Sequence, residues 1–175
     1  LMVDGSGDPN TSEAYQDAIG ALHGVSYTLK FLSKETEDLD YVVMPLEGLW
    51  WAEDTADFPG EDKSAWKWTA MIMQPDHITS AQVDSSREQV RKKNDPPVLD
   101  LLRFEALYEG LSVQIMHIGP YADEAPTIAK LHQFATDHGL SLRGKHHEIY
   151  FGDPRRAAPE KLRTVIRQPV EPLAQ

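Results

Sequence analysis

A carboxylate stands in the middle of an apolar, strand-like segment near the C-terminal end of the chain, residues 145–151. Side chains alternate between the two faces of a β-strand, so Glu148 shares one face with His146 and Tyr150. The other face receives the remaining side chains of the motif, His147, Ile149 and Phe151. A carboxylate that is buried without partners costs several kcal/mol. We therefore expect Glu148 to face solvent, to accept hydrogen bonds, or to line a cavity.

Two adjacent tryptophans, Trp50 and Trp51, follow an apolar run and precede an acidic segment, residues 52–65. Core packing is the ordinary role of such rings. Aromatic rings near a carboxylate suit two further roles. A cation can lie against the ring faces and pair with the carboxylate, or apolar walls can desolvate the carboxylate and make it a stronger base near neutral pH. The residues alone leave these roles open.

Other catalytic and metal-binding motifs are missing from the sequence. Gly5-Ser6-Gly7 precedes a predicted helix, but it has no third glycine in step and no Lys-Ser/Thr, and Asp8 adds negative charge, so we interpret it as a turn and not a phosphate loop. There is no Gly-x-Ser-x-Gly or His-Glu-x-x-His pattern, and the adjacent His146 and His147 would point to opposite faces. The chain has no cysteine, which excludes thiolate nucleophiles and disulfides. We predict a site without metal or cofactor.

The composition is that of a soluble globular protein. The chain has 175 residues, of which 41% are hydrophobic and 26% charged, and this balance excludes disordered, collagen-like and coiled-coil proteins. No apolar run reaches the ~18 residues of a membrane span. The net charge of −11 repels phosphate backbones, so direct nucleic-acid binding is not expected. The basic clusters at 91–93 and 155–156 are interpreted as solvated faces or local ion pairs.

Two further expectations concern the whole protein. The absence of cysteine fits a reducing cytoplasm, which is the predicted location. The chain begins at Leu1, within a strand-like pattern and without an initiator methionine. We therefore expect that residues precede it and that the N-terminus is truncated.

The first half is predicted to contain three strands and two helices. Asn10 is expected to cap the first helix, with Glu13 in the N3 position. The apolar residues of this helix recur at helical spacing, at Ala18, Ile19, Leu22, Val25, Leu29 and Leu32. A strand is expected at each of residues 1–3, 41–46 and 66–73. Thr79 and Gln82 form a capping box that begins the second helix, residues 80–93.

The second half is predicted to repeat this plan after a break at Asn94-Asp95-Pro96-Pro97. Strands are expected at 102–108 and 111–118, joined by a hairpin at Glu109-Gly110. A helix with apolar residues at Ile128, Leu131 and Phe134 ends at Gly139. Strands at 145–151 and 162–170 follow. The patterns predict one α+β domain of two strand–helix–strand–strand units, at about 1–94 and about 98–175.

Four segments of the chain carry long motifs: Tyr41–Trp51, Met116–Tyr121, His146–Arg155 and Lys161–Val170. In this order they resemble the GyrI-like family of small-molecule-binding domains over nearly the whole chain. The resemblance implies two pseudo-symmetric β-α-β-β units that form an antiparallel sheet, with helices on one side and a ligand groove between the units. The Trp-Trp and His-His-Glu-Ile-Tyr versions resemble stand-alone members that hydrolyse the cyclopropane ring of DNA-alkylating natural products of the yatakemycin and CC-1065 type.

The resemblance also implies roles for individual residues. By its place in the motif, Glu148 would position or deprotonate the attacking water. Tyr150 or His117 would donate a hydrogen bond to the dienone oxygen, where negative charge develops. Trp50, Trp51 and Tyr121 would stack on the planar substrate as an aromatic cage. Further substrate-binding candidates are the remaining aromatic residues of the motifs and their surroundings, Trp66, Trp68, Tyr27, Tyr108 and His146.

The leading hypothesis is a cytoplasmic enzyme that detoxifies planar or cationic xenobiotics and protects the cell against cyclopropanoids. Two functions of other classes stay open. One is a module that binds and sequesters drugs without chemistry. The other is a protein partner that resembles a gyrase inhibitor, for which the acidic surface would mimic DNA. The paired tryptophans favour the first two hypotheses, and the net charge of −11 favours the third.

Overall fold

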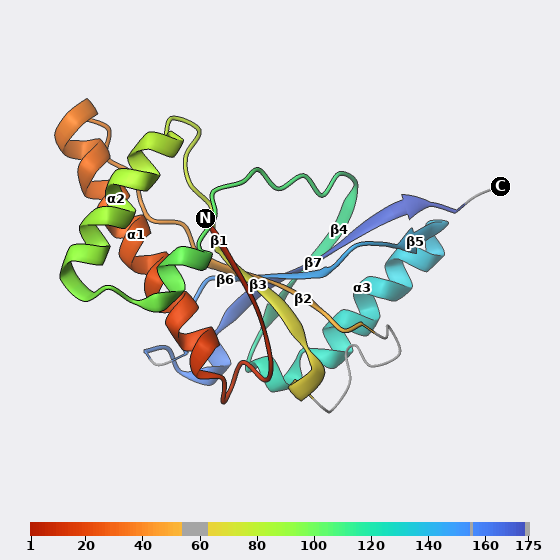
Figure 1. Ribbon diagram of the computed structural model, residues 1–175. Helices are drawn as coiled ribbons and strands as arrows, with labels where there is room; N and C mark the ends of the chain where they lie inside the picture. Colours follow the sequence, from red (N-terminus) through yellow and green to blue (C-terminus); the bar gives the residue numbers. More distant parts are fainter. Residues whose placement is uncertain (54–62, 155, 174–175) are drawn as a thin grey trace. The chain divides into compact units, whose positions relative to one another are not determined.

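The computed structural model describes residues 1–53, 63–154 and 156–173 (Figure 1). These residues form three α-helices and seven β-strands, which confirms the predicted α+β class. The acidic segment at 52–65 and the Arg155-Arg156 cluster lie partly outside the described residues. In the described part of the chain, no helix is both long enough and apolar enough to cross a membrane.

The chain divides into two compact units that interleave in sequence. The first comprises Leu1–Leu46 and Trp51–Ala106, and the second comprises Glu47–Trp50 and Leu107–Gln175. One strand therefore carries residues of both units: β2 (Leu46–Trp51) contributes its four central residues to the second unit.

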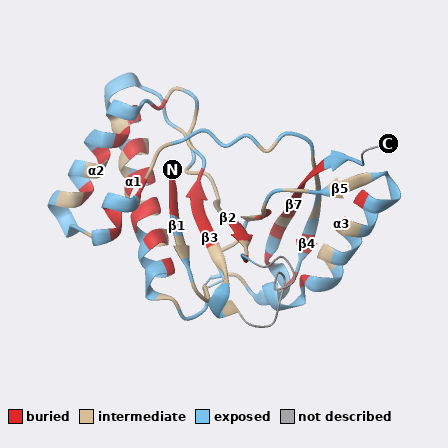
Figure 2. Cartoon of the chain, turned by 45° about the vertical axis from the view of Figure 1, so that its right-hand side comes forward, coloured by how far each residue is buried: buried red, intermediate tan, exposed pale blue. Residues whose placement is uncertain are grey.

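The first unit packs two helices and two strands around an apolar core. β1 (Met2–Ser6) pairs antiparallel with β3 (Lys67–Ile72), with Met2 opposite Met71. α1 (Glu13–Glu37) lies beside α2 (Ser80–Asn94) (Figure 1). The buried residues of α1 form a stripe along one side of the helix (Figure 2), and most of them are apolar, as helical spacing requires. The largest fully buried side chains of this unit are Trp68, Leu22, Leu29, Ile72 and Leu99.

The helix ends of the first unit test the predicted caps. The capping box of α2 is confirmed, because the Thr79 side chain accepts from the backbone N–H of Gln82 and the Gln82 side chain accepts from the backbone N–H of Thr79. The predicted cap of α1 at Asn10 is wrong. Ser12 is the N-cap, and its hydroxyl accepts from the backbone N–H of Tyr15. Asn10 is instead held in the preceding turn by the carboxylate of Asp8, to which its backbone N–H and its side-chain amide both donate.

The second unit is built around the long strand β7 (Arg163–Pro172). β7 pairs antiparallel with β4 (Ser112–Ile118), with β5 (Leu140–Leu142) and with β6 (His146–Tyr150), and β6 is the neighbour of β2. α3 (Ala125–Asp137) lies along β5 (Figure 1). Cross-strand pairing places Thr164 of β7 opposite both Tyr150 of β6 and His117 of β4.

Two predicted strands are wrong. Residues 41–45 form no strand; β2 begins only at Leu46. Pro45 has no N–H for a ladder, and the neighbouring carbonyls of Leu39 and Tyr41 accept hydrogen bonds from α1 side chains instead, from Ser33 Oγ and Lys30 Nζ.

The predicted strand at 102–108 and its hairpin are also absent. Only Arg103 makes a β-bridge, with Met2, and residues 104–111 form neither helix nor strand. The backbone turns at Gly110, whose φ is +68°, and Arg143 donates to the carbonyl of Glu109. The three-residue strand β5 was not predicted, because its pattern is too short to recognise in a sequence.

Candidate functional site

The carboxylate of Glu148 lies on β6 with one hydrogen bond at each oxygen. The hydroxyl of Tyr150 donates to Oε2 at 2.8 Å, and Nε2 of His146 bonds to Oε1 at 3.0 Å. The Glu148 side chain is 14% exposed. All three residues come from one strand face, because the alternation of β6 brings positions 146, 148 and 150 to the same side. Each carboxylate oxygen keeps a further lone pair for a water or a ligand.

Trp50 extends this chain of hydrogen bonds from the neighbouring strand. Its indole N–H donates to the Tyr150 hydroxyl at 2.9 Å, so that Tyr150 accepts from Trp50 while it donates to Glu148. Trp50 is only 4% exposed, so little of its ring is open to solvent in the free protein. The indole orients Tyr150, and through it Glu148.

Gly48 makes this placement of Trp50 feasible. A Cβ atom at position 48 would lie 2.7 Å from Nε1 and 2.8 Å from Cε2 of Trp50. Both distances are far below a van der Waals contact, so the indole lies directly over the glycine.

We expect Gly48→Ala to destabilise the protein by about 1–3 kcal/mol, because the added methyl group must displace a buried ring. The hydrogen bond from Trp50 to Tyr150 should be lost at the same time. Urea unfolding measures the stability, and the indole N–H resonance of Trp50 reports the bond. In a Trp50→Leu background the same substitution should cost less than about 1 kcal/mol. An equal cost in both backgrounds would contradict the steric explanation.

Tyr121 borders the same residues. Its ring packs edge-on against Tyr150 at a centroid distance of 5.4 Å. Burial raises the pKa of Tyr121 to about 12, and the carboxylates of Glu124, Glu148 and Asp153 add to this effect. The negative charges of these carboxylates act on the Tyr121 ring and would favour a cationic ligand beside it.

The second predicted hydrogen-bond donor, His117, is held by two bonds of its own. Nε2 lies 3.1 Å from the carbonyl of Pro120, and Nδ1 lies 3.0 Å from the hydroxyl of Thr127. A carbonyl only accepts, so Nε2 carries the proton toward Pro120. His117 thus fixes the turn that leads to Tyr121. A Cβ at Gly119 would lie 3.4 Å from Nε2 of His117, and the φ of +137° at this glycine favours a residue without a side chain.

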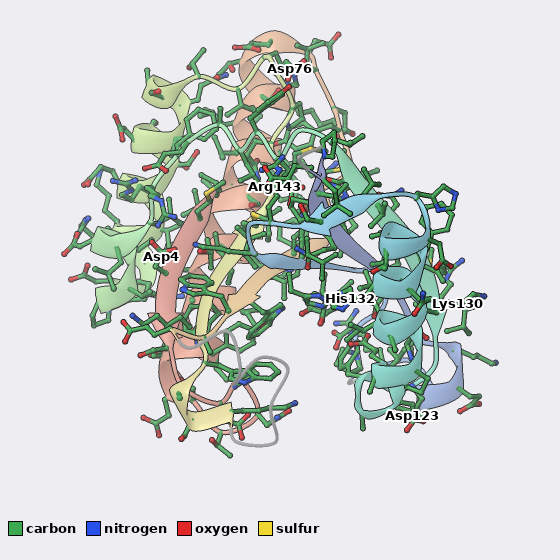
Figure 3. The ribbon with its side chains drawn as sticks, turned by 90° about the vertical axis from the view of Figure 1, so that its right-hand side faces the viewer. Asp4, Asp76, Asp123, Lys130, His132 and Arg143 are labelled. Atoms are coloured by element: carbon green, nitrogen blue, oxygen red, sulfur yellow. The ribbon has the colours of Figure 1, made fainter. Side chains whose placement is uncertain are left out.

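A further histidine lies near the network on α3. Figure 3 shows His132 and Lys130 on opposite sides of that helix. Burial lowers the pKa of His132, and the neighbouring His146 lowers it further. The neutral form of His132 is therefore favoured at pH 7.

The remaining predicted aromatic residues each have contacts of their own. Trp68 is 1% exposed and packs edge-on against Tyr15 at 5.0 Å in the core of the first unit. Trp66 also lies in that unit, with the ammonium group of Lys63 over its ring at 5.0 Å. The last three predicted residues have other surroundings: Tyr27 stacks on His23 of the same helix, Trp51 ends β2, and Tyr108 is 93% exposed. Within the second unit, the hydrogen bonds and ring contacts join Trp50, Tyr121, His146, Glu148 and Tyr150.

A cluster of charged residues on the opposite face of β6 was missed from the sequence. His147 lies between the carboxylates of Glu47 and Glu109, and Glu109 also accepts from Arg167. The sequence signal that could have revealed this cluster is Glu47. It is a second carboxylate inside a strand-like segment, three residues before Trp50. In the described part of the chain, no group of three or more acidic or histidine side chains is placed to hold a metal ion.

Burial and charge act against each other in this cluster. Burial alone would lower the pKa of His147, but its bonds to Glu109 and Glu47 outweigh burial and raise the pKa above the ordinary value of 6.5. Burial alone would raise the pKa of Glu109, but the bonds from His147 and Arg167 lower it below 4.5. The charged forms of both residues are therefore favoured in the folded protein.

These shifts predict how stability depends on pH. The contribution of His147 is fully present below about pH 6.5, its unfolded pKa, and is lost as the pH rises through the raised folded pKa. The contribution of Glu109 is present above about pH 4.5 and is lost as the pH falls through the lowered folded pKa. Urea unfolding between pH 4 and 9 should show that the cluster contributes most to the free energy of unfolding between about pH 4.5 and about pH 6.5. His147→Gln should flatten the alkaline side of the profile, and an unchanged slope there would contradict the assignment.

Comparison with known proteins places these features in a family context. The model of the GyrI-like small molecule binding domain matches residues 1–171. A comparison with curated proteins gives no match. Among solved structures, an uncharacterized conserved protein from Listeria innocua is 44% identical, with a TM-score of 0.88 over 98% of this chain and 86% of the other.

Two further solved structures are described as hydrolases from Listeria innocua. One is 40% identical and the other 42% identical to this chain. Each has a TM-score of 0.83 and covers 98% of this chain and 86% of its own. The similarity thus extends over nearly the whole chain in each case.

Proposed function

This chain belongs to the GyrI-like family of small-molecule-binding domains, and we propose that it hydrolyses the cyclopropane ring of planar, DNA-alkylating cyclopropanoids. The substrate is a flat aromatic compound with a strained ring conjugated to a dienone. Opening this ring destroys the alkylating group, so the reaction would protect the cell. The two solved structures that are described as hydrolases, at 40% and 42% identity, support a catalytic function.

The reaction requires a nucleophilic water and a donor for the developing oxyanion. The water oxygen forms a bond to a ring carbon, the carbon–carbon bond to the conjugated system breaks, and its electron pair moves to the dienone oxygen. Glu148 takes the proton of the water as a general base. Once Glu148 is protonated, it is a weaker acceptor for the Tyr150 hydroxyl. The Tyr150 hydroxyl can then donate its hydrogen bond to the oxyanion. The proton held by Glu148 then passes to the phenolate through solvent, which restores the carboxylate, and the net change is the addition of one water.

The observation that carries this proposal is the setting of the Glu148 carboxylate. It is 14% exposed, it is held by one bond at each oxygen, and an aromatic residue from another strand supports it through Tyr150. A fixed carboxylate of this kind can orient a water toward a bound ring without a loss of side-chain entropy at each turnover. Neither a metal nor a cofactor takes part in the proposed step.

The direct test is mass spectrometry of a cyclopropanoid alkylator incubated with the purified protein in ¹⁸O-labelled water. We expect many product molecules per protein, each heavier than the substrate by one labelled water. A ring-opened analogue serves as the control and should stay unchanged. Recovery of the intact alkylator, with only the slow solvolysis seen in buffer, would reject the hydrolase proposal for this substrate class.

A second candidate function is ligand binding without chemistry. The three carboxylates around Tyr121 favour it, because they attract a cationic aromatic compound whether or not a reaction follows. In this case planar cations should quench tryptophan fluorescence to saturation, and every ligand should be recovered intact. Saturable quenching together with product formation would instead support the enzyme.

A further inference from the structure

The charged cluster on the second face of β6 connects several strands of the second unit. Nε2 of His147 lies 2.8 Å from Glu47 Oε2, and Nδ1 lies 3.0 Å from Glu109 Oε2. Arg167, which is opposite His147 on β7, donates to Glu109 at 3.2 Å and to Gln114 of β4 at 3.0 Å. The cluster thus spans β2, β6, β7 and β4.

The chemistry of the partners fixes the protonation of His147. A carboxylate only accepts hydrogen bonds, so a histidine that bonds to a carboxylate at each nitrogen carries a proton on both. His147 is 1% exposed, and the side chains of Glu47 and Glu109 are each 13% exposed. The imidazolium and the Arg167 guanidinium balance the two carboxylates, so the buried group is neutral overall, as burial of charges requires.

This cluster holds together the same two strands that carry the Glu148 network on their other face. Glu47 and Trp50 are both residues of β2, and His147, Glu148 and Tyr150 are residues of β6. The bond from Glu47 to His147 therefore joins β2 to β6 on one face, while the bond from Trp50 to Tyr150 joins them on the other. A shift of β2 along β6 would break both bonds together.

We propose that the His147 imidazolium is a positioning residue: clamped between Glu47 and Glu109, it fixes β2 against β6 and so places the Trp50–Tyr150–Glu148 chain. His147 does not touch the substrate; it acts through the strand that carries Trp50. The catalytic consequence of this clamp rests on the proposed function. The structural consequence can be tested without a substrate.

Two matched variants separate positioning from general stabilisation. Glu47→Gln and Glu109→Gln each remove one carboxylate from His147, but only Glu47 belongs to the strand of Trp50. We expect both variants to unfold at lower urea concentration than the wild type. Only Glu47→Gln should move the indole N–H resonance of Trp50, which Trp50→Phe assigns among the four tryptophans. An equal displacement in both variants, or none in Glu47→Gln, would overturn the proposal.

A second measurement tests the imidazolium itself. Nitrogen NMR of the His147 ring at pH 7.5 should show a proton on both nitrogens in the wild-type protein. In Glu47→Gln with Glu109→Gln, the ring should lose one proton at this pH. A neutral His147 in the wild-type protein would overturn the clamp, whatever the activity of the protein proves to be.

The kinetic measurement then links the clamp to turnover. On a cyclopropanoid, Glu47→Gln should lower kcat on the order of tenfold with little change in KM, because the reacting groups are misplaced while ligand contacts remain. Glu109→Gln keeps the bond from Glu47 to His147 that joins β2 to β6, so it should lower kcat less than Glu47→Gln does. If the wild-type protein turns over no cyclopropanoid, the proposed function fails, while the NMR result still decides the clamp. If turnover is present and both variants lose it equally, the positioning role is rejected.

Discussion

Glu148→Gln is expected to lower the turnover of a cyclopropanoid by about 10²- to 10⁴-fold, the usual contribution of a general base. The amide keeps the shape of the carboxylate and can keep both neighbours. Its oxygen accepts from Tyr150, and its NH₂ group can donate to Nε2 of His146 when the ring proton lies on Nδ1. Only the ability to take a proton from water is lost. Ligand affinity, followed by tryptophan quenching, should therefore change little.

The matched control is Glu171→Gln, the same chemical change at an exposed position of β7 in the same unit. It should leave turnover and unfolding unchanged. Turnover by Glu148→Gln at a rate near that of the wild type would remove Glu148 from the reaction. Loss of binding together with turnover would instead assign this carboxylate to ligand recognition, the non-catalytic alternative.

The second large effect concerns the stability of the first unit. We expect Gly5→Ala to destabilise the protein by about 3 kcal/mol, at the upper end of the range for overpacking. A Cβ atom at Gly5 would lie 2.2 Å from Cζ2 of Trp68, a ring that is 1% exposed. Tyr15 packs edge-on against this ring at 5.0 Å, so the indole has little room to move away. Urea unfolding gives the free energy directly.

Gly20→Ala is the control for this measurement. Gly20 is an exposed position of α1, and a Cβ atom there would meet no heavy atom within 4 Å. Alanine is the better helix former, so this substitution should stabilise the protein by about 0.5–1 kcal/mol. The same glycine-to-alanine change thus has opposite signs at two positions of one unit. Destabilisation of similar size at both would show that close packing on Trp68 is not the cause.

Elements with strong local signals could be predicted from the sequence. The capping box at Thr79 and Gln82 fixed the start of α2, because both hydrogen bonds lie within four residues. The α1 pattern was equally clear, and only its cap was displaced, from Asn10 to Ser12. The prediction was wrong where contacts between residues far apart in the sequence determine the backbone conformation. The carbonyl of Tyr41 accepts from Lys30 of α1, and the carbonyl of Glu109, beside Gly110, accepts from Arg143, which is 34 residues away along the chain.

The sequence by itself determined that Glu148 shares a strand face with His146 and Tyr150. This follows from the alternation of one strand and needs no partner. The tertiary structure alone decided which residues meet this face and the opposite one. Trp50 reaches Tyr150, and Glu47 reaches His147, across 100 positions of sequence. Such contacts depend on how β2 lies beside β6, and a strand pattern with a period of two looks the same after a shift of two residues. The strand face of Glu148 could therefore be predicted from the sequence. The contacts of Trp50 with Tyr150 and of Glu47 with His147 could be identified only in the tertiary structure.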